Sequence, residues 1–271
     1  MRYGSGTIVA DIIDPKTKVS VTSGKFIGRT LMYVGIALAV TFAVLAVVAT
    51  PLYFVFAGNG LVGVDTLFSA IKDGNFETLS EVQMSALLVY GILLLVSAIV
   101  MIAMQIWINI SMIAKGKVRM VPFMIYAGTM GVLLASFSLI LPFYEILMAS
   151  GITTLIFGMM ALVAHLLGDR AKWFGIIGIG ILAGLMLIGL ISIPLFFFVP
   201  MVYVVYYYIF SLVSLLAMLL ITAFDFWRIK KIASKGTQSD DLALYCAFNL
   251  YVDYIYILIR ILSLLARNKN N

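Results

Sequence analysis

Long, uninterrupted apolar runs constrain this chain more than any other feature of its sequence. A helix needs about 20 apolar residues to cross the hydrocarbon core of a bilayer. Lipid offers no partner to unpaired peptide groups, so each such run has to be helical. Hydrophobic residues make up 63% of the 271 residues and charged residues only 11%, which leaves little sequence for a soluble domain. The runs that we identify are 30–57, 84–110, 120–142, 149–167, 173–196, 200–224 and 242–266. The sequence therefore predicts an all-α integral membrane protein with seven transmembrane helices.

These runs also divide the chain into three parts. We expect a cytoplasmic N-terminal tail at 1–28, a seven-helix membrane domain at 29–266 and a polar C-terminal tail at 267–271. The first 24 residues are polar and mixed, without a short apolar core ahead of a small-residue cleavage site, so we expect no cleavable signal peptide. The first run should stay in the protein as its anchor. We expect the chain to lie in the cell (plasma) membrane.

The positive charges predict the orientation, because cytoplasmic loops carry an excess of lysine and arginine. The net charge of +6 is spread over short clusters between the apolar runs, which favours orientation signalling over binding of nucleic acid. Six loops agree with a cytoplasmic N-terminus. A seventh crossing would place Arg267 and Lys269 outside, so the side of the C-terminus stays open, and a last helix that re-enters and returns would also fit. The basic residues of the loops that we expect to be cytoplasmic include Lys25, Arg29, Lys115, Lys117, Arg119, Arg170, Lys172, Arg228, Lys230, Lys231 and Lys235.

Asp253 is the clearest polar exception within the apolar runs. An ionisable group at membrane depth costs at least about 2.5–3.5 kcal/mol and usually faces the protein interior. On a helix, Asn249, Asp253, Tyr256 and Arg260 are spaced to form one polar stripe. The stripe predicts an ion or proton path with Asp253 as the titrating group. A buried aspartate that serves packing alone, with tyrosine and asparagine partners, is the alternative.

Asp225 is the second candidate, at the end of the sixth run. By itself it is typical of a solvated helix end beside Trp227 and a basic cluster. With Asp253 it gains another interpretation, because two acids from consecutive helices could share a proton or a divalent cation. Such a pair would act as a pH-dependent latch or as a hard oxygen site for calcium. We therefore predict an ion-binding and pH-sensing pair, with calcium as a permeant or bound ion and no other cofactor.

Enzyme motifs are missing from the sequence. It contains no Walker A loop and no dinucleotide fingerprint, and no H-E-x-x-H or G-x-S-x-G. The single histidine, His165, has no cysteine or acid at zinc-ligand spacing. We expect a protein that is not an enzyme. Gly180 and Gly184 have a spacing that lets helices approach closely, either inside a monomer or in a weak oligomer.

Four segments resemble the Bax inhibitor-1 family. LYVDYIYILIRIL is similar to the C-terminal signature of that family, and FDFWRIK at 224–230 is similar to its YDTQRIK element. ITTLIFGMMALVAH with the following GDRAKWFG resembles the fourth helix and its charged loop, and FIGRTLMYVGIALAVTFAV resembles the first helix. The resemblance covers most of residues 26–266. It implies six helices around a central C-terminal helix, and a pH-sensitive calcium leak governed by two aspartates, here Asp225 and Asp253. In the closed state this pair would share a proton or hydrogen bond, and its separation would open the pore.

The chain departs from the family pattern near this pair. The family has an arginine on an early helix that pairs with the aspartates, whereas the first two runs here carry no charge in their apolar cores. Arg260 matches a C-terminal arginine of the family, and we hypothesise that it supplies a counter-charge. Phe226-Trp227 replaces Thr-Gln, and Tyr256 stands where asparagine is common. The alternative function is a non-conducting membrane protein that regulates partner proteins, such as a membrane protease or stress machinery. A secondary transporter is a third candidate.

Overall fold

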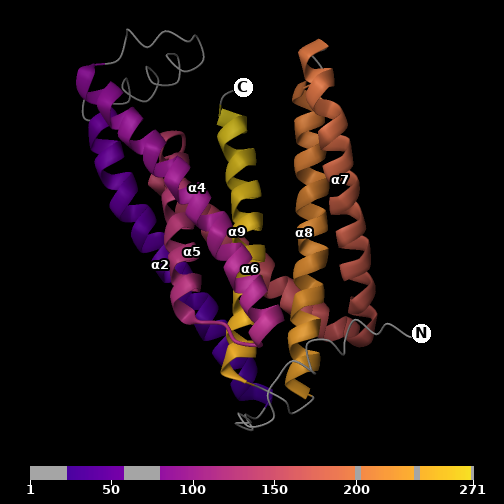
Figure 1. Cartoon of the computed structure of the whole chain (residues 1–271). Coiled ribbons are helices and arrows are strands. Elements are labelled where there is room, and N and C mark those ends of the chain that lie inside the picture. Colours follow the sequence, from indigo (N-terminus) through magenta and orange to yellow (C-terminus); the bar gives the residue numbers. More distant parts are fainter. Residues whose placement is uncertain (1–22, 58–79, 199–202, 235–238, 270–271) are drawn as a thin grey trace. The chain divides into compact units, whose positions relative to one another are not determined.

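The computed structural model describes residues 23–57, 80–198, 203–234 and 239–269, and these residues are almost all helical, with no strand among them (Figure 1). Long apolar sequence explains this, since the helix satisfies every backbone group within the segment. The elements are α2 (Ser23–Ala57), α4 (Glu81–Lys115), α5 (Met120–Leu134), η3 (Ala135–Leu139), α6 (Phe143–Leu167), η4 (Gly168–Ala171), α7 (Lys172–Phe198), α8 (Tyr203–Ser234) and α9 (Asp240–Lys269).

Six helical segments among the described residues are long and apolar enough to cross a membrane. The fourth segment, Phe143–Gly189, contains α6 and most of α7, which meet at the short 3-10 turn η4. The chain is therefore a multi-pass helical membrane protein, as the apolar runs predict. The count of seven crossings and the enclosure of the last helix by six others stay predictions. The six segments are Gly24–Val55, Glu81–Lys115, Met120–Leu139, Phe143–Gly189, Ile209–Ser234 and Asp240–Ala266.

The helices group into two compact units, and α2 and α6 contribute to both. The described part of the first unit runs from Met32 to Ile146 and holds most of α2 together with α4, α5 and η3. Gly131 of α5 lies against α2, where an added Cβ would come within 2.5 Å of the Thr41 carbonyl oxygen. The Thr41 hydroxyl donates to the Ala127 carbonyl oxygen at 3.0 Å. A glycine is therefore required for this close approach of α5 to α2.

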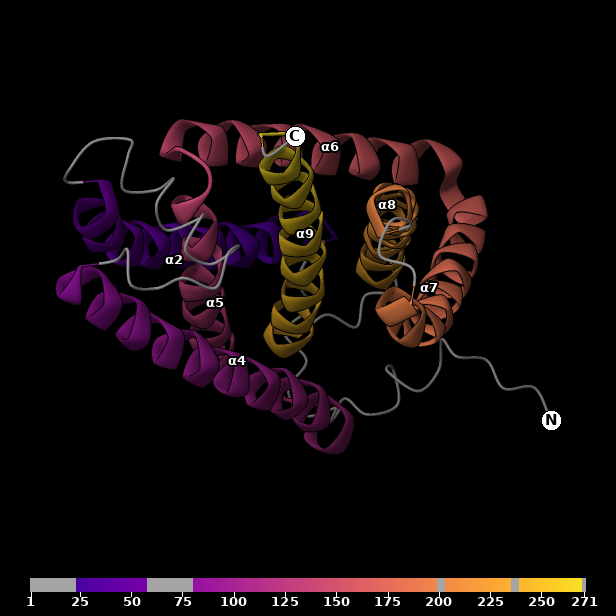
Figure 2. The same ribbon diagram turned by 90° about the horizontal axis from the view of Figure 1, so that it is seen from above.

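The second unit comprises Lys16–Leu31 and Leu147–Asn271, and its described part contains the first turns of α2, most of α6, and α7, α8 and α9. Within it, α6 lies across α8 and α9, and α7 lies beside α8 (Figure 2). The Tyr254 hydroxyl of α9 donates to the Ser150 carbonyl oxygen of α6 at 3.0 Å. Phe157 of α6 packs edge-on against Phe226 of α8 at 4.9 Å between ring centroids. These contacts hold the second half of the chain together around α8 and α9.

The close approach of α7 to α8 depends on Gly178. A Cβ at Gly178 would lie 3.0 Å from the Ala217 carbonyl oxygen and 2.8 Å from a side-chain carbon of Ile221. Apart from the adjacent residues and the backbone of α7 itself, no described atom lies within 4 Å of the Cβ positions of Gly180 and Gly184. Gly178, and not Gly180 or Gly184, is therefore the glycine that lets α7 pack closely against α8.

Burial distinguishes α9 from the other helices. In its apolar window 72% of the residues are buried, against 11% to 44% in the other five segments. Its buried residues include large side chains such as Phe248, Tyr251 and Leu258. A helix that is buried on most of its faces can carry a polar residue away from lipid, and α9 is the helix that carries Asp253.

Candidate functional site

The side chains of Asp225 on α8 and Asp253 on α9 are close enough to interact with each other. Both are shielded from solvent, because the Asp225 side chain is 13% exposed and Asp253 is 5% exposed. The structure therefore brings together the two aspartates that the sequence singles out. An ionised carboxylate can only accept hydrogen bonds, so a hydrogen bond between these two carboxyl groups would require one of them to carry a proton.

Thr222 is the third polar group of this site. It precedes Asp225 by three residues, so both side chains leave α8 on the same face. Its hydroxyl donates to the Met218 carbonyl oxygen at 2.8 Å and also contacts the Asp253 side chain. Thr222 is fully buried. The sequence prediction did not include Thr222, although its spacing from Asp225 is the signal that would find it.

The Oδ2 atom of Asp253 is buried and makes no hydrogen bond to any part of the chain that the structure describes. Leaving a buried polar atom unsatisfied costs about 1–3 kcal/mol. Such a group in a folded protein needs an explanation, for example stored strain, a role in function or a bound water molecule or ion. This oxygen is therefore the atom of the site at which a water molecule or a cation would gain most from binding.

Arg228 supplies the positive charge next to the pair. Its Nη1 atom lies 3.8 Å from Oδ1 of Asp225, one helical turn along α8. The Arg228 side chain is 33% exposed, so its positive charge is partly open to solvent, whereas Asp225 is more deeply buried. Arg260, which we expected to provide a counter-charge, instead places its guanidinium over the Phe210 ring at 5.6 Å from the centroid. The positive charge next to Asp225 is therefore that of Arg228 and not that of Arg260.

The polar stripe predicted along α9 is interrupted on either side of Asp253. Asn249 is half-buried, whereas Tyr256 is 42% exposed. The buried tyrosine next to the aspartate is Tyr254, whose hydroxyl also contacts the Thr154 hydroxyl at 3.0 Å. Helical spacing alone cannot separate Tyr254 from Tyr256, because which one is buried depends on where α6 crosses α9.

The oxygen ligands at the pair are few. No group of three or more histidine, cysteine, aspartate or glutamate side chains that could hold a metal ion occurs among the described residues. Calcium takes 6–8 oxygen ligands. Asp225 and Asp253 could contribute carboxylate oxygens to a calcium ion in transit, and the remaining ligands would be water and hydroxyl or carbonyl oxygens.

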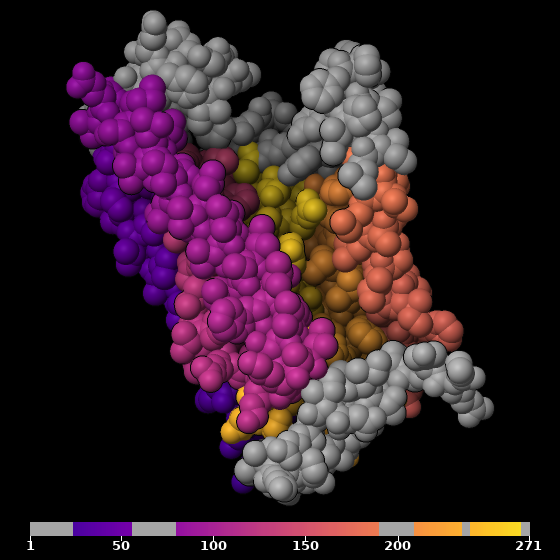
Figure 3. All heavy atoms as spheres, viewed as in Figure 1, coloured from indigo at the N-terminus to yellow at the C-terminus, as the bar shows by residue number. Residues whose placement is uncertain are grey.

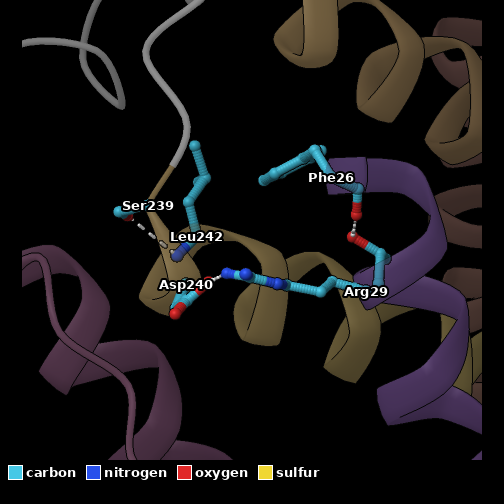
Figure 4. Close-up of polar contacts among 6 residues, drawn as sticks. Phe26, Arg29, Ser239, Asp240 and Leu242 are labelled. Atoms are coloured by element: carbon cyan, nitrogen blue, oxygen red, sulfur yellow. Dashed lines mark hydrogen bonds and ion pairs between the residues drawn. The ribbon is translucent and has the colours of Figure 1, made fainter. Parts of the chain in front are cut away.

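A separate ion pair joins the first turns of α2 to the start of α9. Figure 4 shows Arg29 reaching Asp240, beside the Ser239 side chain that accepts a hydrogen bond from the Leu242 amide. Asp240 lies 13 residues before Asp253, which is about 20 Å along a helix. Arg29 of α2 therefore pairs with the first residue of α9 and not with Asp253. This agrees with the sequence, in which no arginine lies in the apolar core of the first two runs to pair with the aspartates.

The turn after α6 is tied to the end of α8 by a second polar cluster. Asp169 accepts a hydrogen bond from Trp227 Nε1 at 3.3 Å and lies 3.7 Å from the Lys231 amine. Lys230 Nζ lies 3.0 Å from His165 Nδ1. These contacts are exposed. His165 is thus at a helix end among basic residues, which agrees with an interfacial position and not with a zinc site.

Comparison with known proteins agrees with the sequence motifs. The family model described as "Inhibitor of apoptosis-promoting Bax1" matches residues 23–271. The match starts at the first residue of α2 and includes Asp225, Asp253 and Arg228. No curated protein and no solved structure matches the chain.

Proposed function

Because the chain belongs to the Bax inhibitor-1 family, we propose that it is a channel that lets calcium leak down its gradient and that responds to pH. The observation that carries the proposal is the buried contact between Asp225 and Asp253. Carboxylate oxygens suit calcium, a hard cation. Two acids that share one proton also give a site that changes charge with pH.

The gate that we propose is the shared proton. While one proton lies between Asp225 and Asp253, the carboxyl groups attract each other and hold α8 against α9. Loss of this proton leaves two negative charges, and like unit charges about 4 Å apart repel by about 4 kcal/mol at an effective dielectric constant of about 20. This energy corresponds to roughly a 1,000-fold shift between two states. The pair would then separate and admit a cation.

Asp225 and Asp253 have different surroundings, and we propose different roles for them. The cation beside Asp225 favours its ionised form, so we propose that Asp253 carries the shared proton. Oδ2 of Asp253 has no partner among the described residues and would bind the entering ion or its water. Tyr254, Tyr256, Asn249 and Arg260 would line or flank the path as supporting residues, and only the first of these is buried.

The membrane arrangement is part of this proposal. We propose seven crossings, with α6 and α7 as separate spans and α9 enclosed by the others, in the cell membrane with a cytoplasmic N-terminus. The short turn η4 carries Asp169 and Arg170, two charges that favour the membrane surface over the hydrocarbon core. The large buried share of α9 supports its enclosure.

Calcium flux into liposomes tests the proposal. Purified protein is reconstituted around a fluorescent calcium indicator, and entry is recorded across a pH series. We expect wild-type flux to rise with pH as the shared proton leaves. Asp253→Asn and Asp225→Asn should abolish this pH dependence, because an amide neither shares nor loses the proton. Glu81→Gln, an exposed acid at the start of α4, is the matched control and should keep the wild-type profile.

If both aspartate variants keep the wild-type flux and its pH profile, the channel proposal fails. A purified wild-type protein that passes no calcium at any pH would favour the non-conducting regulator. In that case a partner that co-purifies in fixed proportion is expected.

A further inference from the structure

A cavity of about 510 Å³ lies between the end of α4 and the beginning of α5, within the first unit. In Figure 3, α4 lies at the front of the view, and α5 is its neighbour in the first unit. Three of the residues that line the cavity, Trp107, Val121 and Ile125, are exposed on the outside of their helices, where lipid would reach them. The residues that line this cavity all belong to the first unit, whereas Asp225 and Asp253 belong to the second.

Positive charge surrounds one end of this cavity. Lys115, Lys117 and Arg119 all line it, all three are exposed, and no acidic residue is among the lining residues. Gly116 ends α4 in the left-handed conformation with a φ of 59°, so the chain turns within a few residues and the three cations gather at one place.

The beginning of α5 adds to this positive potential. Arg119 is the N-cap residue of α5, and its side chain makes no capping hydrogen bond. The amides of a first helical turn carry a partial positive charge and form a natural site for a phosphate group. The basic side chains and the helix dipole therefore act on the same end of the cavity.

The rest of the cavity is apolar. Ile108, Val121, Pro122 and Ile125 line it together with Met104. Trp107 also lines it and is 60% exposed. Tryptophan prefers the interface between lipid headgroups and acyl chains. A free anion would use the basic end alone, whereas a molecule with a charged head and an apolar chain would use both parts.

We propose that this cavity binds an anionic phospholipid. The phosphate of the headgroup contacts Lys115, Lys117 and Arg119, and one acyl chain lies along the apolar wall beside Trp107. The turn from α4 to α5 is on the side that the charge pattern assigns to the cytoplasm, where the leaflet carries anionic lipid. Basic pockets between membrane helices recognise such headgroups by charge complementarity.

Quenching of Trp107 by brominated lipids tests this site. In a Trp173→Phe, Trp227→Phe protein, Trp107 is the only fluorescent tryptophan. In mixed vesicles we expect brominated phosphatidylglycerol to quench it at lower mole fractions than brominated phosphatidylcholine. A matched reporter with Trp107→Phe and Trp227→Phe leaves Trp173, which is exposed on α7 beside Lys172 and outside this cavity. Both lipids should quench that reporter equally.

Removal of charge gives the second measurement. Lys117→Gln with Arg119→Gln should weaken the preference of the Trp107 reporter for phosphatidylglycerol roughly 30-fold, which corresponds to about 1 kcal/mol for each cation near the surface. Arg170→Gln with Lys172→Gln removes two exposed cations from another loop that we assign to the cytoplasm and should leave the preference unchanged.

Three results would overturn the proposal. The first is equal quenching of Trp107 by the two lipids, which would describe an unspecific lipid annulus. The second is a preference that survives the Lys117 and Arg119 changes. The third is an equal preference of the Trp173 reporter for phosphatidylglycerol, which would describe a general attraction of anionic lipid to the basic loops.

Discussion

At the scale of single residues, the charge next to the aspartate pair sets where the pair releases its proton. Arg228 lies 3.8 Å from Asp225 and is one-third exposed, so its effect is screened by solvent. Without this cation, a second negative charge at the pair is harder to form. We predict that Arg228→Gln moves the rise of calcium flux to higher pH by up to about 0.7 unit, equivalent to about 1 kcal/mol.

The measurement is the pH profile of flux in liposomes. Arg228→Lys keeps the positive charge beside Asp225 and should keep the profile. A profile that moves to lower pH in Arg228→Gln would contradict the assigned role of the arginine.

The sequence identifies the acids of the site but not their partners. Asp253 stands out because an ionisable residue in an apolar run is costly. Arg228 could equally be an orientation signal, since it belongs to a basic cluster at a helix end. Arg260 shares a helix face with Asp253, yet seven residues correspond to about 10 Å along the axis. Helical periodicity predicts on which face of a helix a side chain lies, but it does not predict which other side chains that residue contacts.

At the scale of helices, the contact of α7 with α8 makes a prediction about stability. A side chain at Gly178 would collide with the Ala217 backbone, which cannot move without shifting α8. We predict that Gly178→Leu destabilises the protein by about 1–3 kcal/mol, the usual cost of overpacking. Thermal unfolding in detergent, followed by size-exclusion chromatography after heating, measures the effect.

Gly180→Leu is the matched control for this change, because no described atom lies near its Cβ position. Equal loss of stability in the two variants would show that the substitution acts on the helix itself and not on its contact with α8. The expected order is a clear loss for Gly178→Leu and a small change for Gly180→Leu.

Helix bounds differ from the apolar runs for a physical reason. The run at 84–110 marks only the lipid-compatible core, whereas α4 starts after the N-cap Ser80 and ends at Lys115, before the C-cap Gly116. Likewise α8 continues to Ser234, beyond the run at 200–224, because its basic residues are good helix formers. Hydropathy therefore predicts the part of each helix that can lie in lipid. The residues that cap a helix set where it begins and ends.

At the scale of the whole molecule, the second unit gives a prediction for the side of the C-terminus. Arg29 and Asp240 form an ion pair, so the first turns of α2 and α9 lie at the same end of this unit. If the N-terminus is cytoplasmic, α9 also starts on the cytoplasmic side. α9 is one uninterrupted helix from Asp240 to Lys269, about 45 Å long, and a bilayer core is about 30 Å thick. A re-entrant turn does not fit such a helix, so the C-terminus should lie outside.

Cysteine labelling of intact cells checks this topology. Cys246→Ser removes the single native thiol, and a cysteine is then introduced by Lys269→Cys or, as the matched cytoplasmic control, by Ser234→Cys at the end of α8. A membrane-impermeant maleimide should label the Lys269→Cys protein in intact cells and the Ser234→Cys protein only after permeabilisation. Labelling of both only after permeabilisation would place the C-terminus inside, and α9 would then not cross. The positive charges of the C-terminal tail oppose the predicted orientation, but they come last in the chain, and the first helices usually decide how the remainder inserts.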